Sequence, residues 1–324
     1  MANWIFYPPL KHMSGGCMVL VQLARHMHQM GCLQGLLYWD TLPSEYDQTL
    51  PWVRATDASL CSEDRLIVPE GWPNALALGL RAGCQCTIYC QNWSYLFHGL
   101  DQEVRWNALP VDFWAVSHPV AWYLAQVLGQ HPPIIRPAID DRLFFPPTRK
   151  PDGPARIGFM PRKNKALAEQ IQRIFTERNP ALPVQWLPVH GLSQAGVAEV
   201  LRSCHIFLST GFPEGCPLPP LEAMACGCLC VGFTGFGGWD YMRQGSDNGY
   251  APQGYVLRDT PWSGNGWWCA DGDVLGAALG LEWALGNLKN DLLHTQAAHT
   301  ATSYTFAAQG HELAAALSIV RRAP

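Results

Sequence analysis

The chain has 324 residues, which is long for a single hydrophobic core and predicts two domains. Charged residues make up only 15% of the sequence and the formal net charge is −4, so a nucleic-acid partner is excluded and no Lys/Arg cluster favours anionic lipid. No apolar run is long enough to span a membrane, and Pro8-Pro9 interrupt the short apolar start, so we expect a cytoplasmic protein without a signal peptide.

The first half of the chain alternates short apolar segments with helix-like segments. Helices are predicted at residues 17–30, where Gly31 follows as a stop, and at residues 121–128. Strands are predicted at residues 4–7, 33–38, 65–68, 87–89, 113–116 and 134–135. This alternation is typical of a parallel, doubly wound α/β sheet.

The composition changes between Pro146 and Pro154, where proline, glycine and charged residues predict an extended linker. We therefore place a first domain at residues 1–147 and a second at residues 155–305. Strands are predicted in the second half at residues 156–160, 184–187, 205–209 and 229–233, and helices at 166–177, 193–203, 221–226, 273–288 and 307–322. Two nucleotide-binding folds facing across a cleft are expected, with ligands at the carboxyl ends of the strands.

The twelve cysteines gather in part into two groups, one of which alternates within an apolar run that predicts a buried strand. Buried thiols in a reducing compartment explain this pattern, because a C-x-C spacing within a strand does not close a tetrahedral zinc site. No metal site is expected. The two groups are Cys84, Cys86 and Cys90, and Cys226, Cys228 and Cys230.

The segment from Ser209 to Gly227 has the order strand, loop, helix. A strand ends near Ser209 and a loop rich in glycine and proline follows. Pro219 and Pro220 suit the first turn of a helix, where the missing N–H group costs nothing, and Gly227 is placed to end that helix. This order predicts a ligand-binding loop at the edge of a sheet.

Two glutamates lie in this segment, Glu214 in the loop and Glu222 in the predicted first helical turn. Free amide groups at the helix start, together with the helix dipole, suit a diphosphate. A carboxylate in the same turn is best used on the vicinal hydroxyls of a ribose, and Glu214 is placed to reach the sugar beyond the phosphates. The predicted binding segment also includes Gly215, Cys216, Pro217 and Leu218.

The string E-G-C-P-L-P-P-L-E-A-M-A-C-G resembles the E-x7-E signature of retaining family-4 glycosyltransferases with the GT-B fold, the glycosyl transferases group 1. The resemblance implies two Rossmann-like domains, with Glu214 on the donor sugar and Glu222 on the nucleotide ribose. It also implies that the last helix, in residues 306–324, packs back toward the first domain and that neither a metal nor another cofactor is needed.

Further segments resemble this family in order and place. Gly15 and Gly16 match a glycine-rich loop that lets the backbone approach the donor or acceptor. Arg162 and Lys165 match the pair that grips the donor diphosphate, and Lys165 is preferred to Lys163. The stretch from Arg136 to Pro146 matches a hinge, and Phe236-Gly237-Gly238-Trp239-Asp240 matches a second glycine loop near the donor.

The chain departs from the family where many members carry a histidine in the first domain. Gln91 or Asn92 stands at that place, and neither amide can take up a proton. Asn92 is interpreted as a sugar contact. His98 and His118 remain open as substitutes.

The resemblance implies transfer of a sugar from a UDP-, GDP- or dTDP-sugar to a glycan or other hydroxyl acceptor, with retention. Arg162 and Lys165 would then stabilise the leaving diphosphate, and Glu214 would orient the donor. Two alternatives stay open. One is a nucleotide-sugar epimerase of the same fold, and the other is a degenerate protein that binds sugar nucleotides or glycans without turnover.

Overall fold

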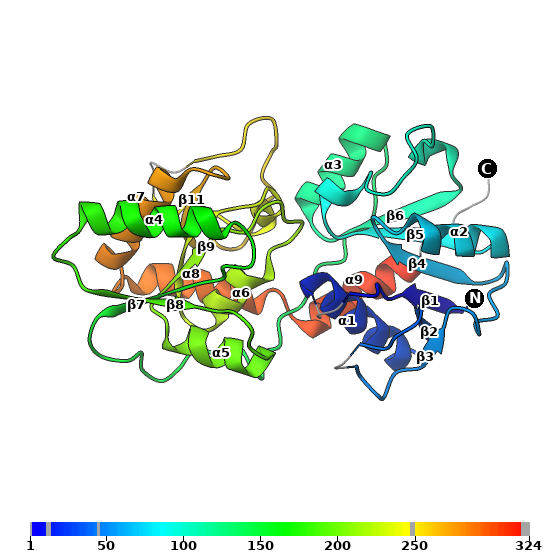
Figure 1. Ribbon diagram of the computed structural model, residues 1–324, viewed down its shortest axis with the longest axis horizontal. Coiled ribbons are helices and arrows are strands. Elements are labelled where there is room, and N and C mark those ends of the chain that lie inside the picture. Colours follow the sequence, from blue (N-terminus) through cyan, green and yellow to red (C-terminus); the bar gives the residue numbers. More distant parts are fainter. Residues whose placement is uncertain (1, 11–13, 44–45, 247–249, 319–324) are drawn as a thin grey trace. The chain divides into compact units, whose positions relative to one another are not determined.

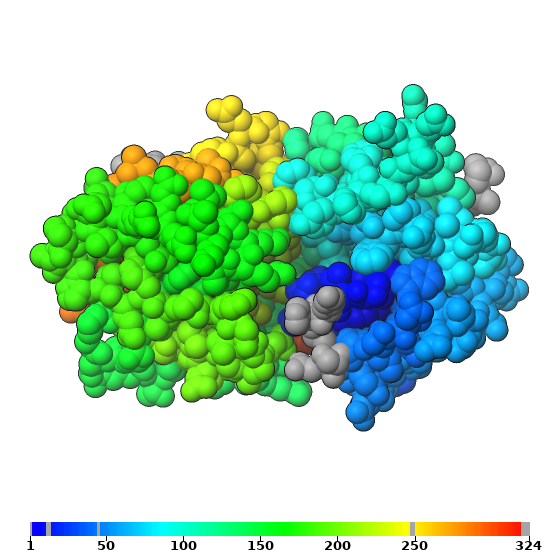
Figure 2. All heavy atoms as spheres, viewed as in Figure 1, coloured from blue at the N-terminus to red at the C-terminus, as the bar shows by residue number. Residues whose placement is uncertain are grey.

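A computed structural model describes residues 2–10, 14–43, 46–246 and 250–318 (Figure 1). The chain divides into two compact units. Unit 1 comprises the chain up to Ala138 and again from Phe306 onward, and unit 2 comprises Ile139–Thr305. In Figure 2 the chain runs from blue to cyan through most of unit 1 and from green to orange through unit 2.

Unit 1 is built on a sheet of six parallel strands in the order β3-β2-β1-β4-β5-β6. Reversal of the strand order on either side of β1 and β4 is the doubly wound arrangement that the sequence predicts. The strands are β1 (Asn3–Phe6), β2 (Leu33–Tyr38), β3 (Trp52–Arg54), β4 (Arg65–Pro69), β5 (Gln85–Cys90) and β6 (Val111–Ala115).

The helices of unit 1 connect these strands and have the expected caps. The Ser14 hydroxyl caps α1 (Gly15–Gln29) and the Ser117 hydroxyl caps α3 (His118–Leu128). The other helices are α2 (Pro73–Ala82), the short η1 (Trp93–Tyr95) and η2 (Trp106–Ala108), and α9 (Phe306–Ser318). Helix α9 packs against α1, where Gln309 Nε2 donates to Gln22 Oε1 at 3.0 Å.

Unit 2 has a second parallel sheet, in the order β11-β10-β9-β7-β8. Its strands are β7 (Ala155–Phe159), β8 (Val184–Pro188), β9 (Ile206–Ser209), β10 (Leu229–Phe233) and β11 (Gly266–Cys269). Its helices are α4 (Lys165–Arg178), α5 (Gln194–Ser203), α6 (Leu218–Ala225), the short η3 (Gly237–Asp240), α7 (Val274–Gly286) and α8 (Asp291–Thr302).

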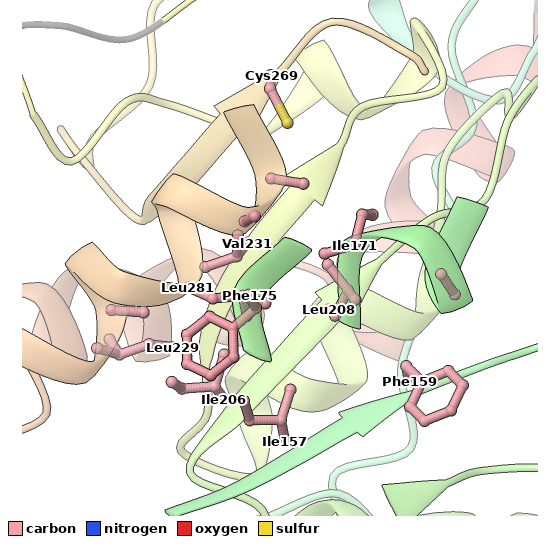
Figure 3. Packing of buried hydrophobic residues seen from close by; sticks show 14 of the residues in the cluster. Ile157, Phe159, Ile171, Phe175, Ile206, Leu208, Leu229, Val231, Cys269 and Leu281 are labelled. Atoms are coloured by element: carbon pink, nitrogen blue, oxygen red, sulfur yellow. The ribbon is translucent and has the colours of Figure 1, made fainter. Parts of the chain in front are cut away.

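The core of unit 2 lies between this sheet and the helices α4 and α7 (Figure 3). Ile157, Leu208 and Val231 come from three neighbouring strands and are fully buried. Phe175 of α4 and Leu281 of α7 pack against them. Burial of apolar surface contributes roughly 25 cal/mol per Å² to the stability of this core. The packed core holds the strands in place and so fixes the positions of the loops at their ends.

The structure confirms the α/β class and most predicted elements, with several differences. Residues 134–135 contribute only an isolated bridge from Ile134 to Ala115. The strands β3 and β11 and the helices α2 and α8 were not predicted. The predicted helix at 307–322 is observed to Ser318, and the rest of it lies outside the described residues.

In the sequence, unit 1 ends at Ala138 and unit 2 begins at Ile139. This boundary comes earlier than the end of the predicted first domain at residue 147. Residues 139–147 belong to unit 2, where Arg202 Nη1 donates to the Leu143 carbonyl oxygen at 2.5 Å. The chain leaves unit 2 again after Thr305. The Ile139 amide donates to the Tyr304 carbonyl at 3.0 Å, so the two ends of unit 2 are joined by a hydrogen bond.

All twelve cysteines are free thiols, and the six that form the two sequence groups are buried. This confirms the interpretation of both groups as packed thiols. Within the described part of the chain, no helix has the length and apolarity required to cross a membrane. Groups of three or more potential metal ligands do not occur among those same residues.

Candidate functional site

Three loops meet at the carboxyl edge of the unit 2 sheet. They follow β7, β9 and β10, which are neighbours in the sheet, so their ends lie at one edge. The loops carry residues 160–164, 210–217 and 234–236. This is the edge at which open α/β sheets bind ligands.

Glu214 is held by its backbone between the second and third of these loops. Its amide donates to the Gly235 carbonyl and its carbonyl accepts from the Gly237 amide, both at 3.0 Å. Gly235 has a φ of +61°, and a Cβ there would lie 2.7 Å from the Glu214 Cβ. A Cβ on Gly237 would overlap the Gly215 carbonyl. The predicted second glycine loop therefore clamps Glu214.

The Glu214 carboxylate forms an ion pair with Lys163. Lys163 Nζ lies 2.8 Å from Glu214 Oε1 and donates to the Pro213 carbonyl at 3.2 Å. The side chains are 28% and 23% exposed, so both charges are partly shielded and remain accessible to a ligand. A cation and a hydrogen-bond acceptor thus stand together at the strand ends, as a phosphorylated sugar would require.

Asn164 joins the first loop to the second, a role that the sequence analysis did not identify. Its side-chain amide donates to the Thr210 carbonyl at 2.9 Å and to the Phe212 carbonyl at 3.2 Å. Its backbone is left-handed, with φ of 57° and ψ of 41°. Asparagine tolerates this conformation better than most residues, so its place directly before a helix was an available signal.

The structure brings Lys163, and not Lys165, to Glu214. Lys165 is the first residue of α4, and its ammonium lies 3.6 Å from Glu169 Oε1 on the same helix. Its side chain is 70% exposed. Arg162 is exposed in the turn before Lys163. The left-handed Asn164 separates the two lysines and directs their side chains to different partners.

The start of α6 differs from the prediction in one respect that matters for anion binding. The helix begins at Leu218 after the N-cap Pro217, so Glu222 lies in the second turn and not the first. The N-cap and first three positions of a helix normally supply free N–H groups. Here three of those four residues are prolines, namely Pro217, Pro219 and Pro220, so only Leu218 carries an N–H group. Positive charge for an anion bound at this helix start would therefore come largely from side chains.

Glu222 is 8% exposed, and burial raises the pKa of its carboxyl to about 7. Nearby in the chain, Thr210 follows the last residue of β9 and is 2% exposed. Its hydroxyl has no hydrogen-bond partner among the described residues. Buried polar groups are normally satisfied, so the Thr210 hydroxyl suits a contact with a polar ligand.

The predicted residues of unit 1 lie at the carboxyl edge of its own sheet. Gly15 and Gly16 open α1, and a Cβ on Gly16 would lie only 3.1 Å from the Gln91 Oε1 atom. Asn92 is buried and caps η1, its Oδ1 accepting from the Ser94 amide at 3.1 Å and hydroxyl at 2.9 Å. The Asn92 oxygen is thus committed to the local backbone.

Sequence reasoning did not single out Glu70, the residue directly after β4. Its two carboxylate oxygens accept from the amides of Gln91 and Asn92, each at 2.8 Å. Burial raises its pKa to about 7, although these two amides favour the charged form. Glu70 therefore fixes the loop on which the predicted sugar contact stands.

The two histidines left open by the sequence have different positions within unit 1. His98 is exposed and lies beside Tyr95, with 6.3 Å between ring centroids. His118 is the first residue of α3 and is half-buried. His98 is on the same post-β5 segment as Gln91, whereas His118 follows β6.

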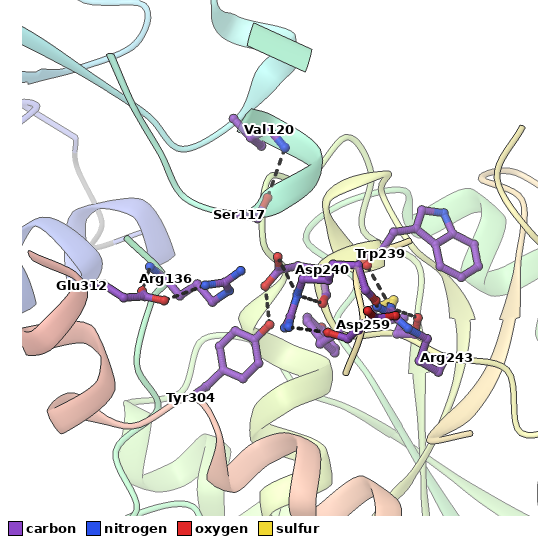
Figure 4. A network of polar contacts seen from close by, with 12 residues as sticks. Ser117, Val120, Arg136, Trp239, Asp240, Arg243, Asp259, Tyr304 and Glu312 are labelled. Carbon is purple, nitrogen blue, oxygen red and sulfur yellow. Dashed lines mark hydrogen bonds and ion pairs between the residues drawn. The ribbon is translucent and has the colours of Figure 1, made fainter. Parts of the chain in front are cut away.

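A polar network fixes η3, the end of the second glycine loop (Figure 4). The fully buried Asp240 accepts from the Tyr304 hydroxyl, and its Oδ1 lies 3.4 Å from Arg258 Nε. Arg243 donates to the carbonyls of Trp239 at 3.0 Å and Arg258 at 2.6 Å. The loop that clamps Glu214 is therefore hydrogen-bonded to Tyr304, close to the point where the chain leaves unit 2 after Thr305.

Residues 157–258 match the family described as glycosyl transferases group 1. This segment contains Lys163, Glu214, Glu222 and the second glycine loop. An α-1,6-glucosyltransferase of Actinobacillus pleuropneumoniae is 29% identical over 180 residues, which are 54% of this chain and 54% of that protein. The alignment thus spans about half the length of this curated relative. Both findings support the predicted glycosyltransferase class.

Solved structures show which fold the chain has. Sucrose-phosphate synthase of Thermosynechococcus elongatus superposes with a TM-score of 0.68 over 97% of this chain and 98% of that one, at 11% identity. The catalytic domain of starch synthase IV from Arabidopsis thaliana gives a TM-score of 0.58 over 98% and 99%, at 12% identity. These likenesses confirm the GT-B fold.

Proposed function

We propose that this chain transfers a sugar from a nucleotide-sugar donor to a hydroxyl acceptor, with retention of configuration and without a metal. The observation that carries the proposal is the Lys163–Glu214 pair at the carboxyl edge of the unit 2 sheet. It lies within the segment that matches the group 1 glycosyltransferases. The curated relative makes a glucosyl transfer onto a glycan the first activity to test.

Each donor group has a suitable partner in unit 2. Lys163 and the Leu218 amide would stabilise the negative charge of the diphosphate, and the exposed Arg162 can add a second positive charge. Glu214 would accept from hydroxyls of the donor sugar. Glu222 would accept from the ribose hydroxyls of a UDP-, GDP- or dTDP-sugar.

The chemistry follows from this placement of charge. As the bond between the sugar and the diphosphate breaks, negative charge grows on the leaving oxygen, and Lys163 would stabilise it. The acceptor hydroxyl oxygen would form the new bond to the anomeric carbon on the face from which the diphosphate leaves, and the leaving phosphate would take the hydroxyl proton. Attack on that same face retains the configuration. Cationic side chains then supply the stabilisation that a metal supplies in other transferases. The carboxyl edge of the unit 1 sheet, which carries Gly16 and Gln91, would bind the acceptor.

A binding and turnover panel tests the proposal. The melting temperature of the full chain is measured with UDP, GDP, dTDP and ADP and with their glucose conjugates, because a ligand that binds only the native state raises it. Turnover with glycan acceptors is then followed with and without EDTA, and the anomeric configuration of the product is read by NMR. The proposal fails if no sugar nucleotide binds.

The same panel separates the two alternatives. An epimerase converts the donor sugar in the absence of any acceptor. A binding protein without activity shows saturable binding and no product with any acceptor. The commitment of the Asn92 oxygen to the Ser94 backbone and hydroxyl is the observation that keeps the second alternative in view.

A further inference from the structure

A polar cavity of about 160 Å³ lies at the amino-terminal side of the unit 1 sheet. Arg65 is the first residue of β4 and Asp112 the second residue of β6, whereas Glu70 and Gln91 follow the opposite ends of β4 and β5. The cavity therefore lies away from the sheet edge that carries Gln91 and Asn92. Its lining is Arg65, Thr87, Asp112, Phe113, Trp114, Gln130, His131, Pro132, Pro133 and, from α9, Ala316.

Arg65 is the unusual member of this lining. It is only 2% exposed, and its guanidinium carbon lies 5.8 Å from the centroid of the Trp114 ring. Nη2 donates to Gln85 Oε1 at 3.3 Å, but Nε and Nη1 have no hydrogen-bond partner among the described residues. A buried charged group with unused donors is costly, so this arrangement indicates an acceptor supplied from outside the chain.

The nearby carboxylate does not use up these donors. Gln85 lies between the two charges, because its Nε2 donates to Asp112 Oδ2 at 2.9 Å while its Oε1 accepts from Arg65. Burial lowers the pKa of Arg65, and the charge of Asp112 opposes that change. Asp112 thus balances part of the positive charge through an intervening amide, and the guanidinium nitrogens Nε and Nη1 still have no partner among the described residues.

The other residues that line the cavity, together with its volume, indicate which kind of molecule fits there. His131 is exposed at the cavity and can donate to an anion beside Arg65. Thr87, Gln130 and Asp112 offer groups that pair with hydroxyls. One bound water needs roughly 10–15 Å³ of such space, so the cavity has room for a molecule about the size of a monosaccharide.

We propose that this cavity binds a small organic anion that carries hydroxyl groups, namely a sugar phosphate or a sugar acid. The anionic group contacts Arg65 and His131, and the hydroxyls contact Thr87, Gln130 and Asp112. The site is separate from the donor site of unit 2 and does not depend on the proposed transfer reaction.

Calorimetric titration of the full chain tests this, with glucose 6-phosphate and glucuronate as probes and glucose and inorganic phosphate for comparison. The nucleotide that raises the melting temperature most in the panel above is present at saturation, so that the nucleotide site is occupied. Both probes are expected to bind with one site per chain, and glucose much more weakly. Arg65→Met should weaken both by about 10- to 100-fold, because charge-assisted hydrogen bonds are lost. Arg81→Met, on the exposed end of α2, is the matched control and should leave binding unchanged.

A second variant covers the case in which Arg65→Met does not fold. His131→Asn lies at an exposed position and should weaken both probes several-fold while leaving the melting temperature in place. Equal affinity in the wild type and in His131→Asn and Arg65→Met overturns the proposal, as does failure of both probes to bind. Binding of the probes only when that nucleotide is absent would place them at the nucleotide site and overturn the proposal too. Inorganic phosphate binding as tightly as glucose 6-phosphate rules out the hydroxyl-bearing class.

Discussion

Two lysines that are separated by one residue have different surroundings. Lys163 Nζ contacts Glu214, whereas Lys165 is exposed and pairs along its own helix. We expect Lys163→Gln to reduce kcat/KM by about 100- to 1,000-fold, because removing one donor to a developing oxyanion has an effect of that size. Lys165→Gln is the control and should stay within about threefold, since exposed ion pairs contribute little. Initial rates with the best donor of the nucleotide panel measure both.

If Lys165→Gln lost far more activity than Lys163→Gln, the diphosphate contact would be assigned to Lys165 and not to Lys163. Equal and small effects would instead assign the charge to Arg162 or to groups outside unit 2. Melting curves of both variants are recorded alongside the rates. Only a loss of activity without a loss of stability bears on the role in transfer.

Glu222 offers a test in which stability and binding change in opposite directions. Its folded-state pKa of about 7 lies above the ordinary value of 4.5, so the folded chain binds the proton more tightly. Its contribution to stability is therefore complete below pH 4.5 and is lost as pH rises through about 7. We expect Glu222→Gln to be more stable than the wild type by about 2–3 kcal/mol at pH 8 and nearly equal at pH 4.5.

Urea unfolding at the two pH values measures this difference, with the exposed Glu169→Gln as control. The same Glu222→Gln variant should bind the nucleotide about tenfold more weakly, because a charged acceptor for the ribose is lost. A variant that gains stability and keeps its full affinity would show that Glu222 is not a ribose contact.

The sequence singles out some residues of this sheet edge more readily than others. Glu214 and Glu222 are singled out by spacing, because both belong to one continuous loop and helix, and their proposed roles stay predictions. The contact of Lys163 with Glu214 was not predicted, because the direction of the lysine depends on the left-handed backbone of Asn164, which no spacing rule reveals. Glu70 was missed because its partners, Gln91 and Asn92, follow a different strand.

At the scale of elements, the glycine loop after β10 holds the Glu214 loop by close backbone contact. We expect Gly237→Ala to lower the free energy of unfolding by about 1–3 kcal/mol, because its Cβ would overlap the Gly215 carbonyl. Its kcat/KM should fall as well, since the hydrogen bond from Gly237 to Glu214 is disturbed. Denaturant titration and initial rates measure the two effects.

Gly286→Ala is the matched control for this substitution. Gly286 is the last residue of α7, and a Cβ there would meet no atom of the described residues within 4 Å. Alanine should therefore be neutral or stabilising by up to about 1 kcal/mol, in keeping with helix propensity. If both alanine variants behave alike, the clamp on Glu214 is not a tight one.

The elements that the sequence predicts well are the buried central strands and the amphipathic helices. Strands such as β9 and β10 are buried throughout, so their apolar runs stand out. The strand β3 has only three residues at the edge of its sheet, and α8 combines mostly small and polar residues. Neither has a periodicity strong enough to identify it.

At the scale of the whole molecule, one of the two units is built from two segments that lie far apart in the sequence. Unit 2 is continuous, whereas unit 1 requires α9 from the far end of the chain. Gln309 of α9 donates to the Arg136 carbonyl at 2.9 Å, and Glu312 lies 2.6 Å from Arg136 Nη1. The composition change at Pro146 lies inside unit 2 and not at its boundary. Composition also does not show that the final helix belongs with the first domain, a placement that only the family resemblance implied.

This discontinuity predicts which half of the protein folds alone. A fragment of residues 139–305 keeps its whole sheet and core, and its ends are already joined by the hydrogen bond from Ile139 to Tyr304. We expect it to unfold cooperatively and to bind the nucleotide of the full chain with similar affinity. Residues 1–138 alone leave the buried Gln22 and the Arg136 carbonyl without their α9 partner, so that fragment should not fold stably.

Joining residues 306–324 to residue 138 through a short Gly-Ser linker should restore a folded unit 1, because Arg136 already contacts α9. Circular dichroism, thermal unfolding and nucleotide titration of the three fragments measure the outcome. Stable folding of residues 1–138 without α9 would contradict this account of unit 1. Nucleotide binding that requires unit 1 as well would mean that the Lys163–Glu214 edge is only part of the donor site.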